Sequence, residues 1–512
     1  MGPEIMSALS MALSPASLLA NAFGVALGIT FGALPGLTAT MGVALLMPLT
    51  FNMPPVEAFS SLLGMYCGAI YGGCITAILV GTPGTVAAAA TMLEGPRLTA
   101  RGLGKKALDM ATLASFLGGV LSCIALMTIA PLLARAAMAF GPAEYFSVAF
   151  FGMAIVATLA ASSVLKGAIA TLLGLYIATI GGDPISGELR NTFEIPALFG
   201  GISLVPILVG LFAVGQILIS LEEGFISKDK PIKKVDVSGK GLGLREFFSH
   251  WVTLIRSSII GIVVGIVPAT GSGTASYIAY STAKQTSKHP EKFGTGILEG
   301  VAATESANNA VTGAALIPLL TLGVPGDMVT AVMLGAMMIQ GLVPGPMLFK
   351  DAPDAVFGIF IALWVANCLM CAMGLVAVRP LSKVLQIPKG ILMPSVMTLC
   401  VVGGYAVNNS MFDLYIVSIF GVLGYVMHKI DMPASPLLLS VILAPIAETN
   451  FRRALVISNN DYSVFVTSPI CVCVLLASFL VVARAAWMEV NRRRREHGNG
   501  TEPGEQSPDG TA

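Results

Sequence analysis

Two stretches, GITFGALPGLTAT (residues 28–40) and GIVVGIVPATGSGT (residues 261–274), decide the fold of this 512-residue chain. Both carry two glycines and a proline at identical spacing within an apolar run. Proline removes a backbone donor and clashes with the preceding turn, and glycine permits conformations that end a helix. We therefore expect an apolar helix to break at each stretch. Unwound backbone at membrane depth is tolerated only where it is buried in protein or lines a wet cavity.

A second pair of matching motifs follows at a similar distance, GTPGT (81–85) and GVPGD (323–327). We expect these to be tight turns or the tips of re-entrant hairpins. Interrupted apolar segments at corresponding places in two halves indicate the binding site of a secondary transporter. Asp327 is the only acid in a long apolar stretch, and either ion coupling or capping of the following helix would account for it. The turn residues are Gly81, Thr82, Pro83, Gly84, Thr85, Gly323, Pro325, Gly326 and Asp327.

The composition places these motifs in a membrane protein. Hydrophobic residues make up 55% of the chain and charged residues 11%, whereas a soluble domain carries about 25% charged residues. We predict an all-α polytopic membrane protein of about ten to twelve spans, because a span needs about 20 apolar residues. Its parts would be a first repeat (1–221), a cytoplasmic linker (222–256), a second repeat (257–490), of inverted topology, and a disordered cytoplasmic tail (491–512).

The net charge of +1 says nothing about partners, but the basic residues are clustered. By the positive-inside rule the clusters are cytoplasmic. We therefore expect a multi-pass protein of the bacterial inner membrane with a cytoplasmic C-terminus. The clusters are Arg97, Arg101, Lys105 and Lys106; Lys228, Lys230, Lys233, Lys234, Lys240 and Arg245; Lys284, Lys288 and Lys292; Arg379, Lys383 and Lys389; and Arg492–Arg495.

The first pair of breaks offers the chemistry of an ion and anion site. Hydroxyl groups and freed carbonyl oxygens suit a hard cation such as Na⁺, and the half-helix that starts after each break favours a carboxylate. Close packing of small residues is the alternative explanation. The candidate residues are Pro35, Gly36, Thr38, Ala39, Thr40, Pro268, Thr270, Gly271, Ser272, Gly273 and Thr274, with Na⁺ expected at Thr38, Thr40, Thr270, Ser272 and Thr274.

A polar group precedes the apolar run 310–322. It consists of Glu305, Ser306, Asn308 and Asn309. Residues at i, i+3 and i+4 share one helix face, and ionisable residues at membrane depth are usually functional. We predict a role in substrate or ion binding. The alternative is an exposed helix start at the membrane interface. Glu94 is the first-half counterpart, for which we expect a topological role.

Enzyme chemistry finds no support. Lys105 and Lys106 follow GLG without the Ser or Thr of a P-loop, and HExxH is absent. We therefore expect no cofactor, and transport energy from an ion gradient, Na⁺ or H⁺, or from another subunit. A membrane-embedded hydrolase using Ser272 would need a base within hydrogen-bond reach. That enzyme and a passive anion channel are the alternatives to a carrier.

The motifs resemble those of the large membrane subunit of the tripartite tricarboxylate transporter family (TctA type). The resemblance rests on GALPGLTATMGVALLMPLTF (32–51), on residues 71–108, on GIVPATGSGTASYIAY (265–280) and on ESANNAVTGAALIPLLTLGVPGD (305–327), and runs from about residue 15 to 490. It implies a translocation pathway accompanied by a small membrane subunit of about four helices and a periplasmic substrate-binding protein. The implied substrates are organic carboxylates, including tricarboxylates such as citrate, imported by symport with Na⁺ or H⁺.

Overall fold

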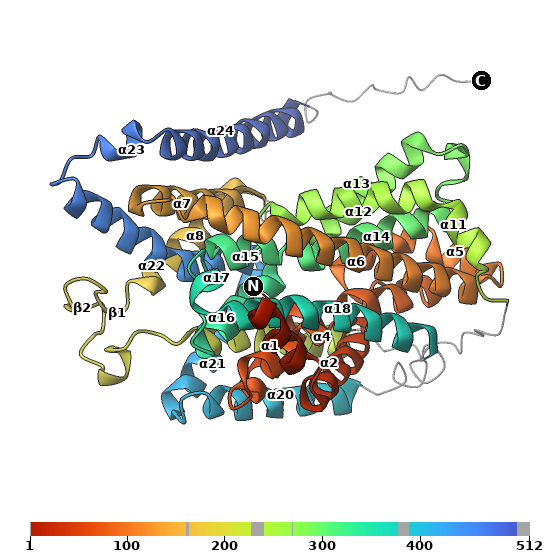
Figure 1. Cartoon of the computed structure of the whole chain (residues 1–512), viewed down its shortest axis with the longest axis horizontal. Helices are drawn as coiled ribbons and strands as arrows, with labels where there is room; N and C mark the ends of the chain where they lie inside the picture. Colours follow the sequence, from red (N-terminus) through yellow and green to blue (C-terminus); the bar gives the residue numbers. More distant parts are fainter. Residues whose placement is uncertain (1, 160–162, 227–239, 269, 377–388, 499–512) are drawn as a thin grey trace, which may run out of the picture.

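The computed structural model describes residues 2–159, 163–226, 240–268, 270–376 and 389–498. This part of the chain is helical throughout its length apart from connecting loops and one small hairpin (Figure 1). The hairpin pairs β1 (Gly181–Gly182) with β2 (Leu189–Arg190) in antiparallel register. The prediction of an all-α polytopic membrane protein is confirmed.

In the described residues, eight helices are long and apolar enough to cross a membrane. Six shorter apolar helices accompany them, and two of these flank the expected breaks, Ala39–Thr50 after the first and Trp251–Ile266 before the second. The eight long segments are Pro15–Ala33, Pro55–Leu79, Gly104–Ala137, Leu204–Glu222, Pro353–Val376, Met411–Lys429, Ala434–Ile457 and Pro469–Asn491.

The first half of the described chain contains α1 to α10. Its helical elements are α1 (Gly2–Ala12), α2 (Pro15–Ala33), α3 (Ala39–Leu46), η1 (Met47–Thr50), α4 (Pro55–Leu79), η2 (Val86–Ala89), η3 (Thr91–Leu93), α5 (Gly95–Ala100), α6 (Gly104–Ala137), α7 (Pro142–Leu159), α8 (Val164–Ala178), η4 (Pro196–Leu198), α9 (Leu204–Leu208), the π-helical η5 (Val209–Val214) and α10 (Gly215–Ile226).

The second half contains α11 to α24. Its helical elements are α11 (Leu244–Ser249), α12 (Trp251–Ile266), α13 (Gly271–Thr286), η6 (Pro290–Lys292), α14 (Leu298–Ala314), α15 (Leu316–Leu322), α16 (Met328–Ile339), α17 (Leu348–Asp351), α18 (Pro353–Val376), α20 (Lys389–Ala406), α21 (Met411–Lys429), α22 (Ala434–Ile457), α23 (Val464–Thr467) and α24 (Pro469–Gly498).

Helix α4 lies at the centre of the molecule, and every residue from Ala58 to Leu79 is buried. It packs along α2 through glycines that recur every four residues on both helices. A Cβ atom at Gly28 would lie 2.4 Å from the carbonyl oxygen of Met65, so the backbones are in contact, as small residues permit in membranes. The glycines are Gly24, Gly28 and Gly32 on α2 and Gly64, Gly68 and Gly72 on α4.

Helix α14 has the corresponding place in the second half. Every residue from Gly300 to Ala314 is buried, and α12 packs on it through Gly261, whose added Cβ atom would lie 2.3 Å from the carbonyl oxygen of Ala307. Both halves therefore contain, in the same order, a helix that breaks, a second helix, a long buried helix and a GxPG turn. The inverted relation between the halves stays a prediction.

Two of the expected segment boundaries meet the limits of the described chain. Helix α10 continues to Ile226, and residues 227–239 of the expected linker lie outside the described residues. Helix α24 runs on to Gly498, so the first eight residues of the tail that we expected to be disordered are helical. Arginine and glutamate in RRRREHG favour helix, so α24 continues beyond the spanning segment, which ends at Asn491.

Candidate functional site

The first break separates α2 from α3, as the sequence predicted. Helix α2 ends at Ala33 and α3 begins at Ala39. Gly36 has a φ of +94°, a backbone conformation that other residues rarely adopt. Thr38 caps α3, because its hydroxyl oxygen accepts the backbone N–H of Met41 at 3.1 Å.

The second break separates α12, which ends at Ile266, from α13, which begins at Gly271. The Thr270 hydroxyl donates to the carbonyl oxygens of Val264 at 2.6 Å and Val267 at 2.8 Å. It thereby satisfies carbonyls that the end of α12 leaves free. No side chain caps the first turn of α13, so its backbone N–H groups remain available.

The two GxPG motifs form equivalent turns. Gly81 and Gly323 have φ of +75° and +71°. The next glycine of each motif packs on the end of the broken helix of its own half. A Cβ atom at Gly84 would lie 1.9 Å from the carbonyl oxygen of Gly32, and one at Gly326 would lie 2.6 Å from that of Gly265. Each turn therefore holds the helix end that precedes a break.

A cavity of about 490 Å³ brings both breaks and both turns together. The predicted residues that line it are Thr38, Ala39, Thr40, Thr85, Thr270, Gly271, Ser272, Gly273, Thr274 and Asp327. Pro35, Gly36 and Pro268 lie in the breaks but do not line the cavity, and neither do Gly81, Thr82, Pro83, Gly84, Gly323, Pro325 or Gly326.

Four α-helices of the described chain begin at this cavity. They are α3, α13, α16 and α22, whose first residues all contribute to the lining. A helix N-terminus carries partial positive charge and free N–H groups, so the four starts together favour a carboxylate. No lysine or arginine of the described chain lines the cavity. An anion here would depend on helix dipoles, on hydroxyl groups and on co-bound cations.

The sequence reasoning missed the far wall of the cavity. It consists of α10, η5, the end of α21 and the start of α22, with Gln216 and His428 as its polar residues. The remaining lining from this side is apolar and includes Leu211, Phe212 and Ile219. A histidine near the end of an apolar segment was the one signal available, and nothing in the sequence connects it with the breaks.

Asp327 caps α16 at the edge of the cavity. Its carboxylate accepts the backbone N–H and the hydroxyl of Thr330, both at 2.8 Å, and the Thr330 hydroxyl oxygen accepts the Asp327 N–H at 2.9 Å. The Tyr66 hydroxyl donates to the second carboxylate oxygen at 2.5 Å. Of the two roles considered for Asp327, capping is visible in the structure, and ion coupling stays a prediction.

Glu305, Ser306, Asn308 and Asn309 do not line the cavity. They lie inside α14 and are fully buried, so the alternative of an exposed helix start is wrong. Glu305 accepts hydrogen bonds from the hydroxyls of Thr91 and Ser115, and the Asn309 amide donates to Ser115 at 2.7 Å. Ser306 bonds back to its own helix at the carbonyl of Ala302.

Glu94 is also fully buried. Its carboxylate accepts the backbone N–H groups of Gly294, Gly296 and Ile297 and the hydroxyl of Tyr280. It therefore ties the first half of the chain to the loop before α14, which is a more specific role than the topological one expected from the sequence.

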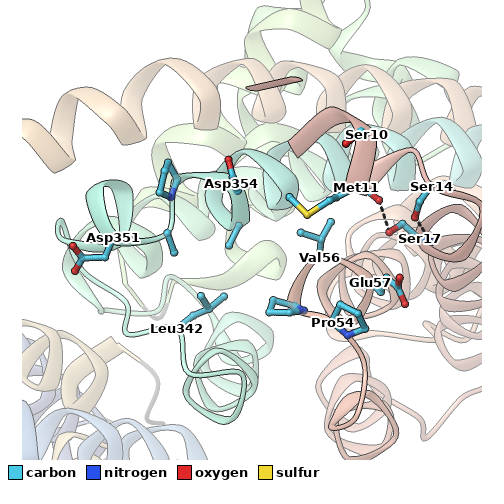
Figure 2. A pocket seen from close by; sticks show the side chains of 14 residues that line it. Ser10, Met11, Ser14, Ser17, Pro54, Val56, Glu57, Leu342, Asp351 and Asp354 are labelled. Atoms are coloured by element: carbon cyan, nitrogen blue, oxygen red, sulfur yellow. Dashed lines mark hydrogen bonds between the residues drawn. The ribbon is translucent and has the colours of Figure 1, made fainter. Parts of the chain in front are cut away.

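A second cavity, of about 700 Å³, lies between α1, the start of α4 and the start of α18 (Figure 2). Glu57, Asp351 and Asp354 are among its lining residues, and Figure 2 shows them spread around its edge. None of the residues predicted from the sequence lines it. The described residues contain no group of three or more His, Cys, Asp or Glu side chains that could hold a metal ion. The expected Na⁺ site uses hydroxyl and carbonyl oxygens and stays a prediction.

Comparison with known proteins agrees with this architecture. The chain matches the tripartite tricarboxylate transporter TctA family over residues 18–439. It is 37% identical over 495 residues to an Agrobacterium vitis protein described as an uncharacterized 52.8 kDa protein in the TAR-I ttuC' 3'region, covering 96% of this chain and 98% of that one. A second A. vitis protein, described as an uncharacterized protein in the TAR-II ttuC' 3'region, is 40% identical over 225 residues, which is 42% of this chain and 93% of the relative. This membrane protein therefore belongs to the tripartite tricarboxylate transporter TctA family.

Proposed function

We propose that this chain is the translocating subunit of an ion-gradient-driven importer of organic carboxylates, tricarboxylates among them. One observation carries the proposal: residues from both breaks and both GxPG turns line a single cavity of about 490 Å³. Paired broken segments that meet in the interior are the usual construction of a secondary-transporter binding site.

The carboxylate groups would be held by backbone and hydroxyl groups. The uncapped start of α13 presents the N–H groups of Gly271, Ser272 and Gly273, and the start of α3 faces the same cavity. Charge-assisted hydrogen bonds of this kind are stronger than neutral ones. Since no fixed cation of the described chain lines the cavity, a multiply charged anion requires a co-bound cation for neutralisation.

Na⁺ would bind among oxygen atoms of the same breaks. Thr38, Thr40, Thr270, Ser272 and Thr274 all line the cavity. The Thr270 hydroxyl gives its proton to carbonyl oxygens, so the lone pairs of its own oxygen stay free to bind a cation. Oxygen ligands without thiol or imidazole suit a hard cation.

The orientation follows from the basic clusters. The basic cluster Arg97, Arg101, Lys105 and Lys106 lies on α5 and the start of α6. It lies beside α11, because Lys106 pairs with Glu246 at 2.8 Å, and beside the loop before α14, because Arg101 donates to Gly296 at 3.4 Å. In Figure 1 these elements lie on the right, the β1–β2 hairpin lies on the left, and α24 runs toward the right. We propose that the end carrying α5 and α11 faces the cytoplasm of a bacterial inner-membrane protein, with a cytoplasmic C-terminus. Lys228 to Lys234, Arg379 and Lys383 lie outside the described residues.

Membership of the family implies two partners, a small membrane subunit and a periplasmic binding protein that delivers the carboxylate. The binding protein would dock at the end opposite α5 and α11. One half of the molecule would then move relative to the other, which exposes the cavity alternately to each side.

The test is uptake of radiolabelled di- and tricarboxylates into proteoliposomes that contain this chain with its two partners. Accumulation above equilibrium that requires a Na⁺ or pH gradient is expected of a carrier, whereas a passive channel would only equilibrate the substrate. The double variant Thr38→Val, Ser272→Ala should weaken cation-dependent uptake. Its matched control is Thr128→Val, Ser395→Ala, since both residues are exposed and bond only to their own helices. Unchanged cation dependence in the first variant would refute the site.

A further inference from the structure

Two glutamates of the described chain, Glu94 and Glu305, have no exposed surface at all. Burial of an ionised carboxylate costs several kcal/mol unless donors or a cation compensate it. The two residues therefore provide a comparison: the same side chain, equally buried, with different partners. The partners indicate which of the two can remain ionised.

Glu94 is compensated as an anion. It accepts the backbone N–H groups of Gly294 at 2.5 Å, Gly296 at 2.6 Å and Ile297 at 3.0 Å, and the Tyr280 hydroxyl at 2.7 Å. Three of these four donors are backbone N–H groups, so the Glu94 carboxylate is well supplied with hydrogen bonds in its buried position.

Glu305 has a much poorer set of donors. All of them are side-chain groups: the hydroxyls of Thr91 and, at 3.4 Å, of Ser115, and the amide of Asn308. In the described chain it accepts no backbone N–H group and forms no ion pair. Tyr71 and Cys74 of α4 are the titratable groups that face it, and neither carries positive charge. From α13, Tyr280 is bonded to Glu94 instead, and α12 faces α14 through Gly261 and Gly265.

Unpartnered acceptors lie next to Glu305. Asn308, one turn further along α14, lies with its amide against the carboxyl group, and its amide oxygen has no hydrogen-bond partner in the described residues. The Asn309 amide oxygen is also unpartnered. Both side chains are fully buried. A buried acceptor without a donor is costly, and a protonated Glu305 would supply the missing donor.

A line of polar groups joins Glu305 to the cavity. Ser272 lines the cavity, and the Ser276 hydroxyl contacts the carbonyl oxygens of Ser272 at 3.0 Å and Thr304 at 3.3 Å. Thr91 then bonds to the Thr304 hydroxyl at 2.9 Å and to Glu305. The buried carboxyl group is thus connected with the proposed substrate site without lining it.

We propose that Glu305 is the proton-binding site of the transporter, protonated when α14 is buried as seen here and deprotonated once during each transport cycle. The inference rests on the proposed function and adds a proton to the cations that are coupled to transport. One proton from the outside water forms an O–H bond with a Glu305 oxygen, and the same O–H bond breaks to release the proton inside. Asn308 is a positioning residue that accepts the hydrogen bond of the protonated form.

The experiment compares Glu305→Gln with wild type in proteoliposomes that contain the three-part system and a radiolabelled tricarboxylate. Three conditions are measured: a pH gradient, a Na⁺ gradient, and exchange of labelled for unlabelled substrate without a gradient. Gln mimics protonated Glu, so exchange should persist while the accumulation ratio under the pH gradient falls to about one. Glu94→Gln is the matched control: it should lower thermal stability but leave the pH-gradient response of the folded protein intact.

Asn308→Leu keeps the inference testable if Glu305→Gln fails to fold. Replacing this buried amide by an apolar side chain of similar size removes both the amide donor and the amide acceptor beside Glu305. The pH of half-maximal uptake should therefore shift away from the wild-type value, and an unchanged value would count against the inference. Accumulation driven by the pH gradient in Glu305→Gln would overturn the inference, as would wild-type accumulation driven by Na⁺ alone. Absence of wild-type uptake in every condition would instead refute the proposed function.

Discussion

Tyr66 and Asp327 join the two halves of the molecule. The Tyr66 hydroxyl, on the buried helix α4, donates a 2.5 Å hydrogen bond to the Asp327 carboxylate, which caps α16. The same carboxylate receives the N–H and the hydroxyl of Thr330. A cap at the cavity edge therefore also orients α16 against α4. Mutation of Asp327 can therefore affect the stability of α16, ion coupling, or both, and experiments can separate these two effects.

Asp327→Ala should destabilise the protein by about 1 kcal/mol or more, because it removes the cap and leaves Tyr66 without its acceptor. Asp327→Asn keeps a capping oxygen and should retain most of the stability. Thermal unfolding in detergent measures stability, and gradient-driven uptake measures ion coupling. Normal uptake by a stable Asp327→Asn protein would restrict Asp327 to its structural role.

The GxPG turns predict a strict requirement for glycine. Alanine at position 84 would place a Cβ atom 1.9 Å from the carbonyl oxygen of Gly32, and alanine at 326 would place one 2.6 Å from that of Gly265. Backbone must move in both cases, at a cost of about 1–3 kcal/mol or more. Melting temperature and transport should fall, and more for Gly84→Ala. Gly200→Ala, where no atom lies within 4 Å, should change neither; equal behaviour of the three variants would contradict the packing described.

The sequence predicted the breaks well because their causes are local. Proline and glycine act on the backbone within a few residues, so the ends of α2 and α12 followed from GALP and GIVP. That the two breaks meet at one cavity could be predicted only from the repeated order of the motifs in the two halves. Gln216 and His428 could not be predicted as cavity residues, because tertiary packing brings them there from α10 and α21 and the sequence near them carries no signal of it.

Burial of polar residues was the other limit. The spacing of Glu305, Asn308 and Asn309 predicted a shared helix face, but spacing cannot tell an interface from an interior. Whether this face is buried depended on the packing of α6, whose Ser115 forms hydrogen bonds with both Glu305 and Asn309. The carboxylate of Glu94 was assigned a topological role for the same reason, since the N–H groups it binds are some 200 residues away in the chain.

The Glu94 carboxylate predicts unequal effects of its partners. Glu94→Ala leaves three backbone N–H groups and the Tyr280 hydroxyl without their acceptor, so a large loss of stability, about 3–5 kcal/mol, is expected. Tyr280→Phe removes one of four hydrogen bonds and should cost about 1 kcal/mol. Thermal unfolding of the two variants in detergent measures the difference. Equal losses would mean that the backbone N–H groups find other acceptors.

Acid should weaken the loop that carries the β1–β2 hairpin, which lies between α8 and α9. The backbone N–H groups of Ser186 and Ile185 hold the pKa of Asp183 well below its usual range, and Arg452 adds to the effect. A lowered pKa in the folded state stabilises the protein above the ordinary aspartate pKa of about 3.9, and this contribution is lost as pH falls through the folded value. The melting temperature in detergent should therefore decline below about pH 4.

The test compares two variants. Asp183→Asn should lower the melting temperature at neutral pH and reduce its decline in acid. The control is Asp351→Asn, which replaces an exposed carboxylate on α17 and should leave that decline unchanged. An undiminished decline in Asp183→Asn would assign the acid sensitivity to other groups.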